Sequence, residues 1–68
     1  MSELKKSIED WLKDKGLEDK YRIKTKEDAF MGEMLILFSV YNNGTEHFEL
    51  ETNYVELIKD HIKEREHI

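Results

Sequence analysis

Apolar positions near the N-terminus recur with the period of an α-helix. They fall at i, i+4, i+7 and i+8 and therefore share one helix face: Leu4, Ile8, Trp11 and Leu12. Ser2 is the expected N-cap, and the helix is expected to end near Lys15. Gly16 suits the left-handed residue that follows a helix, and Leu17 would then contact Leu12 in a Schellman ending.

The next pattern along the chain is that of β-strands. Residues 21–26 alternate between core-type and basic side chains, which predicts a strand with one buried face. Residues 27–32 are expected to form a connection, and further strands are expected over residues 33–41 and 45–51. Residues 34–38 are all apolar, although the chain is 40% charged. A strand that is apolar on both faces is typical of the central position in a sheet.

The turn between the second and third strands is expected to contain three residues, 42–44, with Gly44 left-handed in a G1 bulge. A two-residue turn would place Phe38 opposite Glu49 and so mix apolar and charged side chains on one face. The three-residue turn instead predicts these cross-strand pairs: Phe38 with Phe48, Ile36 with Leu50, and Met34 with Thr52.

A second helix is expected from Asn53 to about Glu66, with Asn53 as N-cap and Glu56 at N3. Its buried stripe would contain Val55, Ile58 and Ile62, with Tyr54, Leu57 or His61 beside them. Residues 1–68 thus predict a single α+β domain of order αβββα. Since both helices are amphipathic on one side only, they are expected to cover the same face of a three-stranded antiparallel meander.

The helices would leave the other face of the sheet open. The core face is expected to carry Ile23, Met34, Ile36, Phe38, Val40, Phe48 and Leu50. The open face would carry one row from each strand: a basic row of Arg22, Lys24 and Lys26, an apolar row of Leu35, Leu37 and Tyr41 with Ser39, and an acidic row of Glu49 and Glu51 with Thr45 and His47. An exposed apolar row of this size is typical of a contact surface. The alternative is that a helix or residues 27–32 fold over it.

Charge is distributed unevenly along the chain, whose net charge is −5. Residues 1–26 hold eight Lys or Arg and six Asp or Glu, whereas residues 27–68 hold three and ten. This asymmetry indicates either an acidic contact surface or a solvated surface that keeps a small protein soluble. The chain has no Cys and no apolar run long enough to span a membrane, so a soluble cytoplasmic protein without membrane contact is expected.

Candidate catalytic and metal-binding residues are sparse. His47, Glu49 and Glu51 share a strand face, but alternate residues of a strand lie about 7 Å apart and make no closed metal site. The three serines have no His and orienting acid in a recognisable pattern. The three glycines are isolated, which excludes phosphate-binding loops. We therefore expect no enzyme activity, no metal and no cofactor.

The order αβββα in 68 residues resembles the double-stranded-RNA-binding domain. That family presents a lysine cluster at the start of its second helix to the RNA phosphates. The matching positions here are Asn53, Tyr54, Val55 and Glu56, and Lys59 is the first basic residue. The resemblance therefore implies the topology alone, and direct nucleic-acid binding is not expected.

The segment Tyr21-Arg-Ile-Lys24 and the hairpin from Leu35 to Glu46, with its Asn-Asn-Gly turn, carry a second resemblance. The layout of residues 7–62 is similar to small acidic phage proteins that inhibit CRISPR nucleases. This resemblance implies that carboxylates stand in for DNA phosphates and occupy a basic groove of a nucleic-acid enzyme. The implied mimics are Glu27, Asp28, Glu33, Glu46, Glu49, Glu51 and Glu56.

The sequence therefore predicts a non-catalytic protein-binding module, in its sharpest form an acidic inhibitor or DNA mimic. Its expected contact residues are Leu35, Leu37, Tyr41, His47, Glu49, Glu51, Glu27, Asp28, Glu33, Glu46 and Glu56. The alternative is a homodimer through the open face, with the basic row of one copy against the acidic row of the other.

Overall fold

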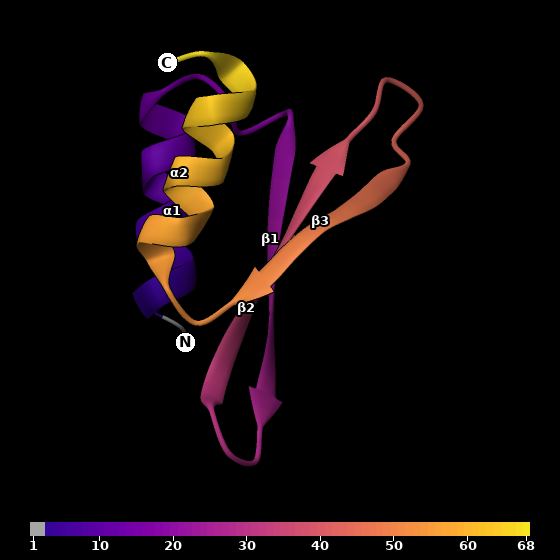
Figure 1. The fold of residues 1–68 in the computed structure, drawn as a ribbon. Coiled ribbons are helices and arrows are strands. Elements are labelled where there is room, and N and C mark those ends of the chain that lie inside the picture. The colour runs from indigo at the N-terminus through magenta and orange to yellow at the C-terminus, as the bar shows by residue number, and fades with distance from the viewer. Residues whose placement is uncertain (1–2) are drawn as a thin grey trace.

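The computed structural model describes residues 3–68, which form two helices on one side of a three-stranded sheet (Figure 1). In chain order the elements are α1 (Glu3–Asp14), β1 (Tyr21–Asp28), β2 (Gly32–Val40), β3 (Glu46–Thr52) and α2 (Val55–Glu66). The strands are antiparallel and lie in the order β1-β2-β3. The predicted αβββα fold is therefore confirmed. Within residues 3–68, neither helix has the length and hydropathy of a membrane span.

Helix α1 ends as its sequence predicts. Gly16 has φ +71°, and its backbone N–H donates to the carbonyl oxygen of Lys13 at 3.1 Å. The N–H of Leu17 donates to the carbonyl oxygen of Leu12 at 2.8 Å. These are the two hydrogen bonds of a Schellman motif. The predicted N-cap, Ser2, lies outside the described residues.

Helix α2 starts differently from the prediction. Its N-cap residue is Tyr54, and no side-chain hydrogen bond caps the helix. The N–H of Tyr54 donates instead to Thr52 Oγ1 at 3.0 Å, because the buried Thr52 closes the turn that leaves β3. The predicted Asn53 cap is therefore wrong, whereas Ile58 and Ile62 are buried as expected.

Helix α2 ends at a left-handed residue that is not glycine. His67 has φ 60° and ψ 43°, and the N–H of Ile68 donates to the carbonyl oxygen of Lys63 at 2.9 Å. A side chain with a Cβ is disfavoured in this conformation, so His67→Gly is expected to raise the free energy of unfolding by about 0.5–1 kcal/mol. Urea denaturation measures the change. Glu64→Gly, inside α2, is the control and should lower stability by about 1 kcal/mol; the same sign for both variants would contradict the prediction.

The core lies between the helices and the inner face of the sheet. Its buried apolar side chains are Ile8, Leu12, Leu17, Tyr21, Ile23, Leu35, Leu37, Ile58 and Ile62. Trp11, Leu50 and Val55 are partly buried and pack against this cluster. The closed end of the β1–β2 hairpin extends past both helices (Figure 1). The core is therefore formed by the part of the sheet that the helices cover.

The predicted assignment of β2 to its two faces is wrong. Leu35 and Leu37 are 0% exposed and belong to the core, because Leu37 pairs with the buried Ile23 of β1. The other face of β2 carries the half-buried residues Met34, Ile36, Phe38 and Val40. β2 is apolar on both sides, so its own pattern fits either orientation. The pairing with β1 decides, since a shift of one residue moves every side chain to the opposite face.

The turn of the β2–β3 hairpin is the predicted one. Gly44 has φ +84°, and its N–H donates to the carbonyl oxygen of Tyr41 at 2.8 Å. The N–H of Tyr41 donates to the carbonyl oxygen of Thr45 at 2.9 Å, so the loop contains the three residues 42–44. This arrangement matches a turn followed by a G1 bulge.

A second bulge within β3 changes the register beyond Phe48. Phe38 pairs with Phe48 as predicted, but the next residue, Leu37, pairs with Leu50. Glu49 is therefore an extra residue in β3. The predicted pairs of Ile36 with Leu50 and Met34 with Thr52 are wrong, because the bulge moves the register by one. The observed pairs are Ile36 with Glu51 and Leu35 with Thr52.

Candidate interaction surface

The face of the sheet opposite the helices, called the open face below, is covered by neither α1 nor α2 (Figure 1). β1 contributes a basic row, β2 an apolar row, and β3 two carboxylates on either side of an aromatic ring. In that order the members are Arg22, Lys24 and Lys26; Met34, Ile36, Phe38 and Val40; and Glu46, Phe48 and Glu51. The predicted succession of basic, apolar and acidic rows is present, but its apolar row consists of different residues.

Ion pairs cross the open face from β1 to β3 above the apolar row. Glu46 accepts hydrogen bonds from Arg22 and from Lys24, whose Nζ lies 2.9 Å from Glu46 Oε1. Lys26 Nζ lies 3.1 Å from Glu51 Oε1. The hydrogen bond from Lys24 is the main cause of the lowered pKa of Glu46. Because the three cations are each 50% or more exposed, these pairs contribute little to stability and can change partners at small cost.

Two phenylalanines occupy the middle of the open face. The rings of Phe38 and Phe48 meet edge to face with their centroids 6.3 Å apart. Lys24 Nζ lies 5.0 Å from the centroid of Phe38, a distance at which a cation and an aromatic ring attract each other. Phe48 was predicted in the core but is 60% exposed. An exposed aromatic ring beside an apolar row has the composition of a protein contact surface.

The apolar contact residues predicted from the sequence lie on the helix side of the sheet. Leu35 and Leu37 are fully buried and form no docking surface. Tyr41 and His47 stack on each other with ring centroids 4.2 Å apart. His47 pairs with the buried Ser39, which places its side chain on the inner face. These residues share a face, as predicted, but it is not the open face.

Glu49 is a structural acid, not the exposed contact residue that was predicted. The bulge turns its carboxylate towards the helices, where it is 14% exposed. Ser39 Oγ donates to Glu49 Oε2 at 2.9 Å. Glu49 Oε1 lies 2.5 Å from Arg65 Nη1 and 3.0 Å from His61 Nε2. The hydrogen bond from Arg65 contributes most to lowering the pKa of Glu49 to about 2. These contacts link β2, β3 and α2.

A second polar contact joins the end of α2 to the start of β1. Tyr21 Oη donates to Glu66 Oε2 at 2.8 Å, and Lys20 Nζ lies 3.2 Å from Glu66 Oε1. Burial, followed by the hydrogen bond to Glu66, raises the pKa of Tyr21 to about 12. These residues and Arg65 border a surface depression of about 560 Å³. Lys20 and Glu66 bind each other and Arg65 binds Glu49, so the charged groups of the depression already serve structural contacts.

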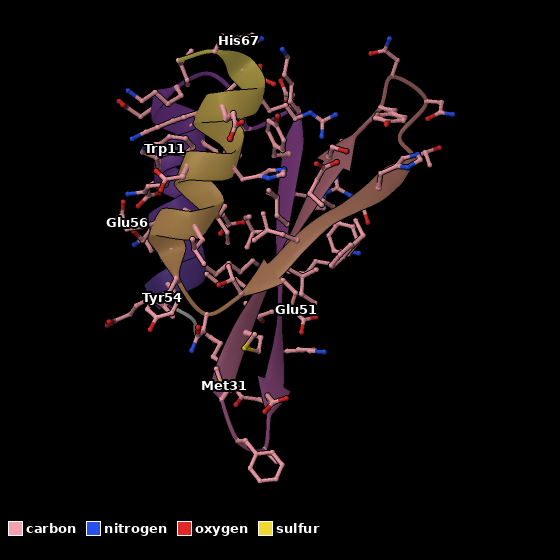
Figure 2. The ribbon with its side chains drawn as sticks, in the orientation of Figure 1. Trp11, Met31, Glu51, Tyr54, Glu56 and His67 are labelled. Atoms are coloured by element: carbon pink, nitrogen blue, oxygen red, sulfur yellow. The ribbon has the colours of Figure 1, made fainter. Side chains whose placement is uncertain are left out.

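The other predicted acids are distributed over three parts of the molecule. Glu46 and Glu51 lie on the open face, and Glu56 lies on α2, 3.9 Å from Lys59. Figure 2 shows Glu51 and Glu56 on opposite sides of the molecule. The remaining three lie at the closed end of the β1–β2 hairpin: Glu27, Asp28 and Glu33. The eleven predicted contact residues therefore do not form one continuous site.

The closed end of the β1–β2 hairpin is held by a side-chain hydrogen-bond acceptor. Asp28 Oδ1 accepts from the backbone N–H groups of Phe30 and Met31 at 2.8 and 2.9 Å. These two bonds lower the pKa of Asp28. Phe30 is 96% exposed, and Met31, labelled in Figure 2, lies at the same end, far from the helices.

One signal in the sequence could have identified the correct face of β2. Asp28 and Gly32 pair with each other on either side of a three-residue loop, and Gly32 has φ +77°. Counting outward from this turn pairs Ile23 with Leu37. The turn residues Asp28 and Gly32 therefore place Leu37 in the core and its neighbour Ile36 on the open face.

Comparisons with family models, with curated proteins and with solved structures found no match for this chain. Within the described range 3–68, no group of three or more His, Cys, Asp or Glu side chains is arranged to hold a metal ion.

Proposed function

We propose that this chain is a non-catalytic protein-binding module that acts through the open face of its sheet. The observation that supports it most directly is the apolar row of β2, which neither helix covers, with Phe48 60% exposed beside it. Such a row presents on the order of a few hundred Å² of apolar surface. Burying it would stabilise a complex by several kcal/mol, at about 25 cal/mol per Å², before the costs of association.

The charges around the apolar row favour a protein partner over a nucleic acid. Arg22, Lys24 and Lys26 are each paired with a carboxylate of β3. A phosphate backbone would have to compete with these carboxylates for every cation. A protein surface that carries both signs of charge can instead replace each ion pair by an equivalent one.

The narrower hypothesis of an acidic inhibitor has less support from the arrangement of the carboxylates. Glu46, Glu49 and Glu51 are paired with cations of the same chain. Pairing reduces the negative charge that these groups can offer to a basic groove. We therefore propose the general binding function, with the apolar row as its centre.

Capture of binding proteins with matched variants tests this proposal. Phe38→Asp places a charge in the apolar row, and Leu57→Asp places the same charge at a 51% exposed position on α2. Each tagged chain is produced in its host, and circular dichroism verifies that both variants are folded. We expect at least one protein to be captured with Leu57→Asp but not with Phe38→Asp. That protein can be an untagged copy of the chain itself. The same proteins in the same amounts with both variants would show that the open face is not the binding surface.

A further inference from the structure

We infer that the partner at the open face is a second copy of this chain, packed face to face about a two-fold axis that runs parallel to β2. The inference rests on the proposed function and names its partner. It follows from the lateral order of the rows, which is basic on β1, apolar on β2 and acidic at two positions of β3. A surface with this order is complementary to itself in only some orientations.

The direction of the axis follows from the charges. Rotation about an axis parallel to β2 preserves the height of each residue along the strands and exchanges the two edges of the sheet. β1 of one copy then lies over β3 of the other, so the basic row faces Glu46 and Glu51. An axis perpendicular to the strands would instead place β1 over β1 and set the two basic rows against each other. Like charges opposite each other disfavour that second arrangement.

The register across the sheet determines which side chains would meet. Lys24 and Glu51 both pair with Ile36, so they lie at the same height. After the rotation, Lys24 of each copy faces Glu51 of the other. Face-to-face sheets lie about 10 Å apart, which a lysine and a glutamate side chain together can span. The two Ile36 side chains would meet each other on the axis.

A second set of contacts is expected two residues further along β2, at Phe38. Arg22 and Phe48 both pair with Phe38. The guanidinium of each Arg22 would therefore lie over the Phe48 ring of the other copy, a favourable cation–π arrangement. The two Phe38 rings would meet near the axis, as the aromatic centre of the interface.

Dimerisation would exchange ion pairs within each chain for ion pairs between the two chains and would bury the apolar row. In one chain Lys24 binds Glu46 and Lys26 binds Glu51, and in the dimer Lys24 would bind Glu51 of the other copy. The exchange costs little because the cations are exposed in the single chain. Burial of the apolar row then favours association. A face of three strands is small for a specific interface, so we expect micromolar affinity.

Sedimentation equilibrium of the purified chain tests the inference. Between about 10 µM and about 1 mM the wild type should pass from one to two chains per particle. Phe38→Asp places two carboxylates together at the axis and should weaken the dimer roughly a hundred-fold or more. Phe30→Asp makes the same change at the 96% exposed hairpin end and should leave the dissociation constant unchanged. A wild type that stays monomeric over this range would overturn the inference.

A charge exchange tests the axis. Lys24→Glu places a carboxylate opposite Glu51 of the other copy at each of the two edges of the interface. This repulsion should weaken the dimer roughly ten-fold. Adding Glu51→Lys to Lys24→Glu should restore the affinity, because the rotation brings these two positions together. A double variant as weak as Lys24→Glu alone would exclude this axis. A monomeric wild type whose capture of another protein is abolished by Phe38→Asp would refute the second copy as partner and leave the proposed function standing.

Discussion

Leu37→Ala is expected to lower the free energy of unfolding of this protein by about 2–5 kcal/mol. Leu37 is 0% exposed and lies in the core between the sheet and the helices. Its truncation removes buried apolar contacts and leaves a cavity among the surrounding side chains. A domain of 68 residues has a total stability of about 3–10 kcal/mol. The substitution therefore removes a large part of it, and a fraction of the molecules should be unfolded without denaturant.

Urea denaturation followed by circular dichroism measures this loss, and Leu57→Ala is its control. Leu57 is 51% exposed on α2, so its truncation should change the free energy of unfolding by less than about 1 kcal/mol. The comparison also tests which face of β2 is buried. Equal losses of stability in the two variants would contradict both the burial of Leu37 and the position of Ile36 on the open face.

Glu49→Gln is expected to lower the free energy of unfolding by about 2 kcal/mol at neutral pH. The substitution keeps the shape of the side chain but removes the negative charge that faces Arg65 Nη1 at 2.5 Å and His61 Nε2 at 3.0 Å. The largely buried position, 14% exposed, makes this contact stronger than the ion pairs of the open face. Urea denaturation at pH 7 measures the loss, with Glu64→Gln on the exposed side of α2 as its control.

The same contact predicts how stability depends on pH. The pKa of Glu49 is lowered from the ordinary value of 4.5 to about 2 in the folded chain, mainly by the hydrogen bond from Arg65, so the folded state holds the carboxylate ionised. The resulting stabilisation, at most about 3 kcal/mol, is complete above pH 4.5 and is lost as the pH falls towards 2. Glu49→Gln should therefore lose less stability than the wild type between pH 4.5 and pH 2. Parallel pH profiles for the two proteins would contradict the assignment.

The sequence was sufficient for the elements because their signals are local. The helical spacing from Leu4 to Leu12, the Gly16 ending and the three-residue turn before Thr45 each depend on a few neighbouring residues. The same holds for the basic row of β1, which alternates with the buried Tyr21 and Ile23. Local backbone conformation and side-chain period are properties that a short segment carries by itself.

The candidate site could be predicted only in its general arrangement. A basic, an apolar and an acidic row across an open face follow from the composition of the three strands, and the structure has this arrangement. The members of the apolar row did not follow, because β2 is apolar on both sides and its period cannot distinguish Leu37 from Ile36. Glu49 was assigned to the surface because no residue pattern announces the bulge that turns it inward.

The sequence by itself therefore determined the number, order and type of the elements, the end of α1, the β2–β3 turn and the basic edge of the sheet. The predicted connection over residues 27–32 is shorter in the structure, where β1 continues to Asp28 and β2 begins at Gly32. The period of β2 left open which side of the strand faces the helices, and no residue pattern showed where Glu49 points; the tertiary structure decided both. The physical reason is that strand pairing is a contact between distant segments. A shift of one residue in that pairing exchanges core and surface along a whole strand, while the local energies of the segment hardly change.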